Sequence, residues 1–186
     1  ADAVEACGFP REAVSIIETT DRAATGALMS LRGIVDLLIP RGGAGLIQRC
    51  VRESLVPVIE TGTGNCHIYL HEDADMQKVL PIIVNAKTQR VGVCNAAESL
   101  LVDAKIADAV LPQVVETLHE HGVLIHGDVA TCAAAAAAGL AEGADYVPAT
   151  EDDWGREYLA LEMSVKVVAD EDEAIAHINC YGTGHS

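Results

Sequence analysis

Apolar residues recur along this chain in two alternating patterns. Short runs rich in Val, Ile and Leu are bounded by turn residues, as buried strands are. Between these runs lie segments of helical composition, some with apolar residues every three or four positions, as on one face of a helix. Helical crossovers between short buried strands favour parallel pairing. The pattern therefore predicts an α/β fold built on a parallel sheet.

The first sixty residues contain the first βαβ unit of this pattern. A short opening helix is expected to end at Gly8. Strands are then predicted at residues 14–18, 35–39 and 56–60, with helices at residues 21–31 and 46–54.

The alternation continues to the end of the chain. Further strands are predicted at residues 66–70, 99–102, 123–126, 146–147 and 165–168. Helices are predicted from a cap at Asp73 or Asp75 to residue 87, from the cap Asp103 to residue 121, over residues 129–140, and after a capping box at Asp170. Pro81 lies inside the first of these helices and should bend it.

Composition and charge narrow the class of partner. The 186 residues carry a formal net charge of −16, which disfavours binding to a phosphate backbone, so no nucleic-acid partner is expected. No run of apolar residues is long enough to span a membrane and no signal segment opens the chain, which favours a cytoplasmic protein. The six cysteines lack C-x-x-C spacing, which indicates free thiols.

A metal-binding module is the weaker alternative for the histidines. Cys66 and His67 lie close to His71 in sequence, and His119, His121 and His126 form a second group. Neither group supplies a complete set of four ligands at ordinary spacing, so no metal is expected.

Two turns between predicted elements carry candidate chemistry. Pro40-Arg41-Gly42-Gly43-Ala44-Gly45 follows a strand and precedes a helix, where backbone N–H groups can hold an anion such as a pyrophosphate. The glycine spacing is not G-x-G-x-x-G, and on spacing alone a plain strand-to-helix turn is the favoured interpretation. Glu60 ends a predicted strand before a second Gly-rich turn, where a carboxylate acts as a base or simply accepts backbone hydrogen bonds.

Cys94 is the candidate nucleophile among the six cysteines. It follows Gly92 and Val93 and precedes a polar segment that we expect to be helical. A helix N-terminus would stabilise its thiolate, and Lys87 or Arg90 would add to this effect. The alternative is an inert cysteine packed among small residues.

Six motifs in collinear order resemble one enzyme family. They are Ile39-Pro40-Arg41-Gly42-Gly43, Val56-Pro57-Val58-Ile59-Glu60-Thr61-Gly62, Gly64-Asn65-Cys66-His67, Asn85-Ala86-Lys87-Thr88-Gln89-Arg90, Val93-Cys94-Asn95-Ala96 and Tyr181-Gly182-Thr183-Gly184-His185. Together they are similar to the gamma-glutamyl phosphate reductases, or glutamate-5-semialdehyde dehydrogenases, of the aldehyde dehydrogenase superfamily. The resemblance implies a three-layer parallel-sheet catalytic domain with the tail end of a Rossmann-like cofactor domain.

The same resemblance implies how the chain is divided. Residues 1–59 would be the C-terminal part of the NAD(P)-binding domain, and residues 60–186 a catalytic domain that carries the cysteine and is cut short at its C-terminus. Because members of the family are about twice as long, we expect this chain to be a middle piece with little activity of its own.

The implied activity is the NADPH-dependent reduction of L-glutamate 5-phosphate to L-glutamate 5-semialdehyde and phosphate, the second step of proline biosynthesis from glutamate. Cys94 would carry the acyl group as a thioester. Arg41, Gly42 and Gly43 would contact the cofactor, and Glu157 its nicotinamide ribose. Charge and location make further residues candidates for binding the substrate: Lys87, Arg90, Asn95 and His185.

One alternative activity and two further partners accompany the resemblance. The alternative is a non-phosphorylating aldehyde dehydrogenase, in which Glu60 would be the general base that activates water. For the full-length protein, the resemblance implies a homo-oligomer, with glutamate 5-kinase as its partner in the pathway.

Overall fold

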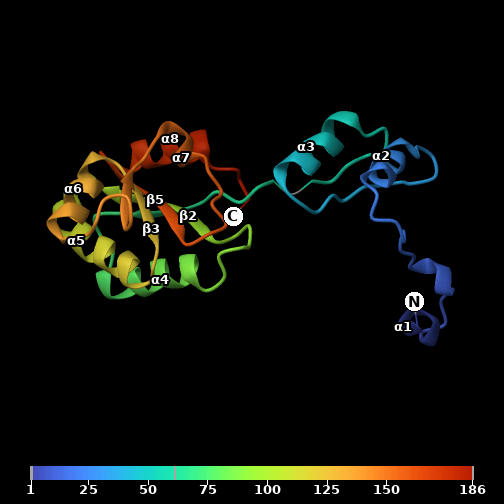
Figure 1. Ribbon diagram of the computed structural model, residues 1–186, viewed down its shortest axis with the longest axis horizontal. Coiled ribbons are helices and arrows are strands. Elements are labelled where there is room, and N and C mark those ends of the chain that lie inside the picture. Colours follow the sequence, from blue (N-terminus) through green and yellow to red (C-terminus); the bar gives the residue numbers. More distant parts are fainter. Residues whose placement is uncertain (1, 61, 186) are drawn as a thin grey trace. The chain divides into compact units, whose positions relative to one another are not determined.

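The structure is a computed structural model that describes residues 2–60 and 62–185. Its backbone contacts divide the chain into two compact units, Ala1–Glu60 and Thr61–Ser186, which we call unit 1 and unit 2 (Figure 1).

The regular elements described in unit 1 are helices. Its elements are α1 (Asp2–Ala6), the 3-10 helix η1 (Arg11–Ala13), α2 (Arg22–Ser30) and α3 (Ala44–Glu53). The Asp21 side chain caps α2 by accepting a hydrogen bond from the backbone N–H of Ala23. A small core forms from side chains that are at most 6 % exposed: Met29, Ile47, Cys50 and Val56.

The strands predicted for unit 1 are largely wrong. Residues 14–18 form no strand and are exposed, although they are rich in β-branched residues. The predicted strands 35–39 and 56–60 meet only at one parallel bridge between Leu38 and Val58. Periodicity reports a local preference, whereas a strand also needs a neighbour that satisfies its backbone N–H and C=O groups. Among the described residues, 14–18 have no such neighbour.

Unit 2 contains a five-stranded sheet in which every pair is parallel. The strands are β1 (Cys66–Leu70), β2 (Ala97–Asp103), β3 (Leu124–Gly127), β4 (Tyr146–Pro148) and β5 (Glu162–Val168). Their order across the sheet is β1-β2-β5-β3-β4. The prediction of an α/β fold with a parallel sheet is therefore confirmed.

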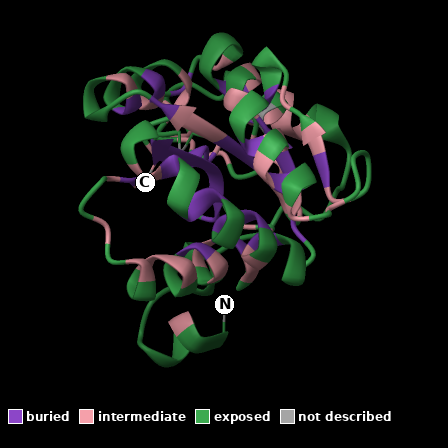
Figure 2. Cartoon of the chain, turned by 90° about the vertical axis from the view of Figure 1, so that its left-hand side faces the viewer, coloured by how far each residue is buried: buried purple, intermediate pink, exposed green. Residues whose placement is uncertain are grey.

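Helices cover both faces of this sheet and make three layers (Figure 1). α4 (Met76–Thr88), α5 (Ala104–Glu120) and α6 (Val129–Ala137) pack over one face, while α8 (Glu171–Tyr181) packs against β5 on the other. Alternation along β2 supplies both cores: Leu100 and Val102 join the α4–α5 side and Leu101 joins the α8 side. All seven residues of β2 are buried, as the purple segments of Figure 2 illustrate.

The helix caps of unit 2 agree with the sequence patterns. Asp75, Asp103 and Asp170 each accept a backbone N–H at the start of α4, α5 and α8. The helix predicted to reach residue 140 ends earlier, at Ala137, and Gly139 follows at φ 81°. The four-residue helix α7 (Glu151–Trp154) was not predicted, because it is too short to show a period.

Candidate functional site

Three segments of unit 2 meet at the amino-terminal edge of the sheet. Because β1, β2 and β5 are parallel neighbours, the residues that precede each strand lie at the same edge. Gly64 and Asn65 precede β1, the turn at residues 91–96 precedes β2, and Glu157 lies in the segment before β5. This edge carries most of the motif residues expected to form a site.

Cys94 lies in the turn before β2 and is exposed. Its carbonyl oxygen faces Gly64 so closely that a Cβ built on Gly64 would lie 1.4 Å from it. The Cys66 thiol also donates to this oxygen, at 3.4 Å. Only glycine fits at position 64, and the backbone of Cys94 is held from two sides.

The helix predicted after Cys94 is absent. The segment continues into β2, so no helix dipole acts on the thiol from that side. The polar run that suggested a helix contains Glu98. Its side chain is buried and paired with Lys87 rather than exposed on a helix face. Exposure of Cys94, rather than a helix N-terminus, is what the structure offers for reactivity.

Glu157 joins this edge through a hydrogen bond. Its Oε1 accepts the backbone N–H of Gly64 at 2.8 Å. The neighbouring Asn65 is 4 % exposed, and its Nδ2 donates to the carbonyls of Trp154 (2.8 Å) and Tyr181 (3.0 Å). These bonds fix the Gly64 loop, and the loop in turn contacts the Cys94 carbonyl.

Arg90 and Asn95, two of the expected substrate-binding residues, line one small cavity of about 160 Å³. The cavity lies between the C-terminal part of α4 and the turn that carries Cys94, and Val93 also lines it. Arg90 and Asn95 therefore line the same cavity beside the turn that carries Cys94.

Lys87 does not lie where a substrate-binding cation is expected. Its ammonium group and the Glu98 carboxylate are both 0 % exposed and 2.6 Å apart. Glu98 also accepts the backbone N–H of Leu159 at 3.3 Å. Burial raises the pKa of Glu98, and the bond from Lys87 opposes that rise. Because its charge is balanced inside the protein, Lys87 is a structural residue here, which corrects its assignment to the substrate.

His126 and its neighbours form a second internal polar network. The His126 ring lies 3.0 Å from a carboxylate oxygen of Asp153 on one side and 3.0 Å from Glu162 on the other. Tyr158 donates to Asp153 at 2.9 Å, and burial raises the pKa of its phenol. Within residues 2–60 and 62–185, no group of three or more His, Cys, Asp and Glu side chains is arranged to hold a metal ion.

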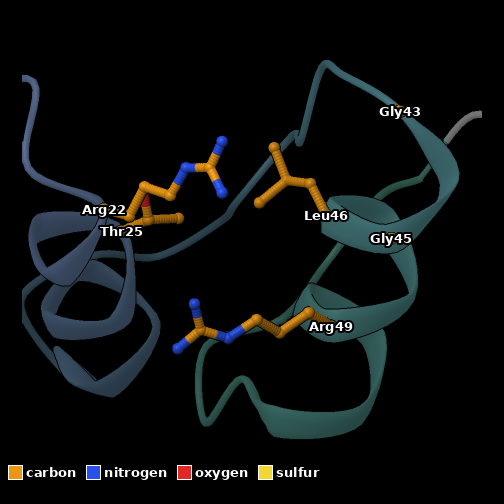
Figure 3. A pocket seen from close by; sticks show the side chains of 6 residues that line it. All are labelled: Arg22, Thr25, Gly43, Gly45, Leu46 and Arg49. Carbon is orange, nitrogen blue, oxygen red and sulfur yellow. The ribbon is translucent and has the colours of Figure 1, made fainter.

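Unit 1 contains the Gly-rich turn and a pocket beside it. Gly43 caps α3, and Gly42 has φ 153°, a value that favours glycine. A pocket of about 470 Å³ lies between α2 and α3, and Figure 3 shows two arginine side chains extending toward it. Its lining residues are Arg22, Thr25, Gly43, Gly45, Leu46 and Arg49.

The sequence patterns did not single out Arg22 and Arg49. Only 12 of the 186 residues are Lys or Arg, so two cations facing one pocket are a notable local concentration. The sequence did contain a signal for Arg49, because this residue lies on the helix that follows the Gly-rich turn. Arg41 itself is exposed and lies outside the pocket lining.

The remaining expected site residues are Glu60 and His185, which belong to different units. Glu60 is exposed and is the last residue of unit 1, whereas Cys94 belongs to unit 2. His185 follows α8 near the end of unit 2. Thr183, two residues before His185, accepts the backbone N–H of Asn65 at 3.3 Å, so the segment before His185 reaches the same edge as Cys94.

Comparison with known proteins defines the class. Residues 1–147 match the model of the aldehyde dehydrogenase family, and the chain belongs to that family. A gamma-glutamyl phosphate reductase of Bifidobacterium longum subsp. infantis is 52 % identical over 186 residues, which are all of this chain and 43 % of that protein. The chain therefore spans less than half the length of this relative.

Solved structures give the same picture. The crystal structure of the gamma-glutamyl phosphate reductase of Thermotoga maritima has a TM-score of 0.87 and 49 % identity, and the match covers 98 % of this chain and 42 % of that one. An acetylating aldehyde dehydrogenase of Geobacillus thermoglucosidasius has a TM-score of 0.69 and 25 % identity over 97 % of this chain and 46 % of its own. The expected aldehyde dehydrogenase-like fold is confirmed. None of the helices described is long and apolar enough to cross a membrane.

Proposed function

We propose that this protein catalyses the NADPH-dependent reduction of L-glutamate 5-phosphate (gamma-glutamyl phosphate) to L-glutamate 5-semialdehyde and phosphate. The observation that carries the proposal is 52 % identity, along the entire chain, to a protein named gamma-glutamyl phosphate reductase. The exposed thiol of Cys94, held on a fixed backbone, provides a matching nucleophile.

The acyl transfer is assigned to Cys94. Its thiolate attacks the acyl carbon of the substrate and a C–S bond forms. The bond between the acyl carbon and the bridging oxygen of the phosphate breaks, so inorganic phosphate leaves with the electron pair. The Cys94 backbone carbonyl is already engaged by its neighbours, so the attack requires rotation of the side chain alone. Arg90 and Asn95 line the cavity beside the turn and are proposed to hold the anionic parts of the substrate. His185 stays a candidate for the same role.

The cofactor is assigned to unit 1. A nicotinamide dinucleotide, when bound, supplies the hydride that reduces the thioester and releases the aldehyde from sulfur. The pocket between α2 and α3 fits such an anionic group, because arginine side chains and the first turn of α3 line it. Arg41, Gly42 and Gly43 belong to the turn that begins α3. Glu157 is assigned to the nicotinamide ribose, a role in which it would exchange its bond with the Gly64 N–H for a ribose hydroxyl.

The wider setting follows from the same assignment. Residues 1–59 are proposed as part of the NAD(P)-binding domain and residues 60–186 as part of the catalytic domain. The reaction is the second step of proline biosynthesis in the cytoplasm, with glutamate 5-kinase as pathway partner and a homo-oligomer as the complete enzyme.

The acyl-transfer step is tested on the purified chain without cofactor. An acyl phosphate, acetyl phosphate or freshly generated gamma-glutamyl phosphate, is added and the protein is analysed by mass spectrometry after proteolysis. We expect one acyl group on the peptide that contains Cys94, removable by hydroxylamine, and stoichiometric release of phosphate. Cys94→Ala should abolish the label.

Two other exposed cysteines provide matched controls. Cys7 belongs to unit 1 and Cys180 lies on α8, and both are exposed like Cys94. Cys7→Ala and Cys180→Ala should leave the label unchanged. Equal acylation of Cys7, Cys94 and Cys180 would contradict the assignment of Cys94 as the acyl acceptor.

A further inference from the structure

The pocket between α2 and α3 gathers positive charge in an acidic chain. Arg22 is the first residue of α2 and Arg49 lies on α3, and Figure 3 shows both side chains extending into the space between the two helices. The formal net charge of the whole chain is −16, so this local excess of cations is not a general property of its surface. Two guanidinium groups that face one pocket repel each other, and an anion bound between them would offset this repulsion.

Neighbouring residues position Arg49 without using all its donors. Its Nε donates to Glu53 at 2.9 Å, one helical turn later on the same helix. A terminal nitrogen of Arg49 lies 3.3 Å from the point where a Cβ on Gly26 would be, so the small residue on α2 leaves room for it. The bond to Glu53 steadies the side chain, and the terminal nitrogens stay available to the pocket.

Arg22 has no such internal partner. Within residues 2–60 and 62–185, its guanidinium makes no ion pair and no hydrogen bond with another residue. The Thr25 hydroxyl lies one turn along α2 and lines the same pocket, as do Gly43 and Gly45 at the N-terminal end of α3. The lining therefore combines two guanidinium forks, a hydroxyl and the positive end of a helix.

We propose that Arg22 and Arg49 bind the 2′-phosphate of the dinucleotide and thereby select NADPH over NADH. This inference rests on the proposed function and names the specificity determinants of its cofactor site. A 2′-phosphate is a phosphomonoester with a charge of about −1.5 to −2 and three terminal oxygens, which matches two guanidinium forks. Each phosphate of a pyrophosphate linkage carries one negative charge and fewer free oxygens.

NADH would bind more weakly because it lacks the 2′-phosphate. It presents a hydroxyl where NADPH has the phosphate, so both arginines would keep their mutual repulsion and gain no charged partner. The pocket volume of about 470 Å³ suits a nucleoside phosphate, and Leu46 adds apolar surface for a base.

The experiment compares two nucleotides on the purified chain by isothermal titration calorimetry. The probes are adenosine 2′,5′-bisphosphate and 5′-AMP, which differ only in the 2′-phosphate. The unmodified chain is expected to bind the bisphosphate on the order of tenfold to hundredfold more tightly. Added salt should reduce that ratio, because the preference is electrostatic.

Substitutions then assign the preference to the two residues. Arg22→Ala and Arg49→Ala should each lower affinity for the bisphosphate on the order of tenfold and leave 5′-AMP binding unchanged. Arg22→Lys and Arg49→Lys retain the charge but lose the fork, so an intermediate loss is expected. Arg52→Ala is the matched control, because Arg52 is exposed on α3 and lies outside the pocket lining. Circular dichroism confirms that each variant is folded.

Either of two results would overturn the inference. One is equal affinity of the unmodified chain for both nucleotides, including the absence of measurable binding. The other is a loss of affinity in Arg22→Ala and Arg49→Ala that is the same for both nucleotides or that Arg52→Ala reproduces. The acylation test of Cys94 uses neither nucleotide. It therefore tests the proposed function independently of this inference.

Discussion

Replacing Lys87 by methionine should destabilise unit 2 by an amount that depends strongly on pH. Lys87 lies in the last turn of α4, and its ammonium group is 2.6 Å from the carboxylate of Glu98 on β2. Both side chains are 0 % exposed. Methionine has nearly the length and helix propensity of lysine, so Lys87→Met removes the charge and little else.

The size of the effect follows from what happens to Glu98. At 2.6 Å and an effective dielectric constant of about 20, the gross attraction is about 6 kcal/mol, which the cost of burying two ions largely offsets. In the variant, the buried carboxylate loses its partner and takes up a proton instead. From its ordinary pKa of 4.5, protonation costs about 3 kcal/mol at about pH 7 and below about 1 kcal/mol at about pH 5.

The sign of the pH dependence is therefore determined. Burial without Lys87 raises the pKa of Glu98 in the folded variant above its value in the unfolded chain. The folded variant thus binds more protons, so its stability is greatest below the unfolded pKa and falls as the pH rises through the folded one. The free energy of unfolding lost on Lys87→Met should grow from about 1 kcal/mol near pH 5 to about 3 kcal/mol near pH 7.

Urea unfolding followed by far-UV circular dichroism measures this at several pH values. Glu98→Gln should also destabilise unit 2, because it leaves the buried Lys87 ammonium group without its carboxylate partner. The double variant Lys87→Met/Glu98→Gln should recover most of the lost stability, since neither charge remains. Lys105→Met is the matched control: its ion pair with Glu72 is exposed, so little change is expected. A pH-independent loss in Lys87→Met would refute the reasoning.

Two further predictions concern the edge that carries Cys94 and the buried histidine of α8. Gly64→Ala places a Cβ where the Cys94 carbonyl lies, so it should lower the urea midpoint and change the rate of Cys94 alkylation, whereas Gly92→Ala, with open space around it, should change neither midpoint nor rate appreciably. Burial lowers the pKa of His177 to about 4, so the protein should lose stability as the pH falls from about 6.5 toward 4, and His177→Phe should flatten this loss in the urea midpoint; an unchanged slope would contradict it.

Sequence reasoning succeeded where structure is decided locally. The bounds of β1 agree with the predicted strand, because alternation and the flanking turn residues are properties of that segment alone. The caps Asp103 and Asp170 were found for the same reason, since each aspartate bonds to an N–H two or three residues later.

It failed where distant residues decide the outcome. The polar segment after Cys94 was predicted to be helical, yet it leads directly into β2. There the Glu98 side chain is buried and forms an ion pair with Lys87. Lys87 was predicted to bind the substrate because of its charge and its place in the sequence. Neither property reveals that its side chain is buried. The contact of Gly64 with the Cys94 carbonyl depends on β1 and β2 being neighbours, a fact of strand order that no local pattern contains.

That contact also limits how far the Cys94 sulfur can travel. With the carbonyl enclosed by Gly64 and the Cys66 thiol, the main chain at Cys94 has little freedom, and the sulfur moves mainly by rotation about χ1 among three staggered positions. The sulfur therefore samples positions on one arc around the Cα–Cβ bond rather than a volume. An electrophile must reach that arc, so the length and shape of an acyl donor, rather than the adaptability of the protein, would determine which thioester forms.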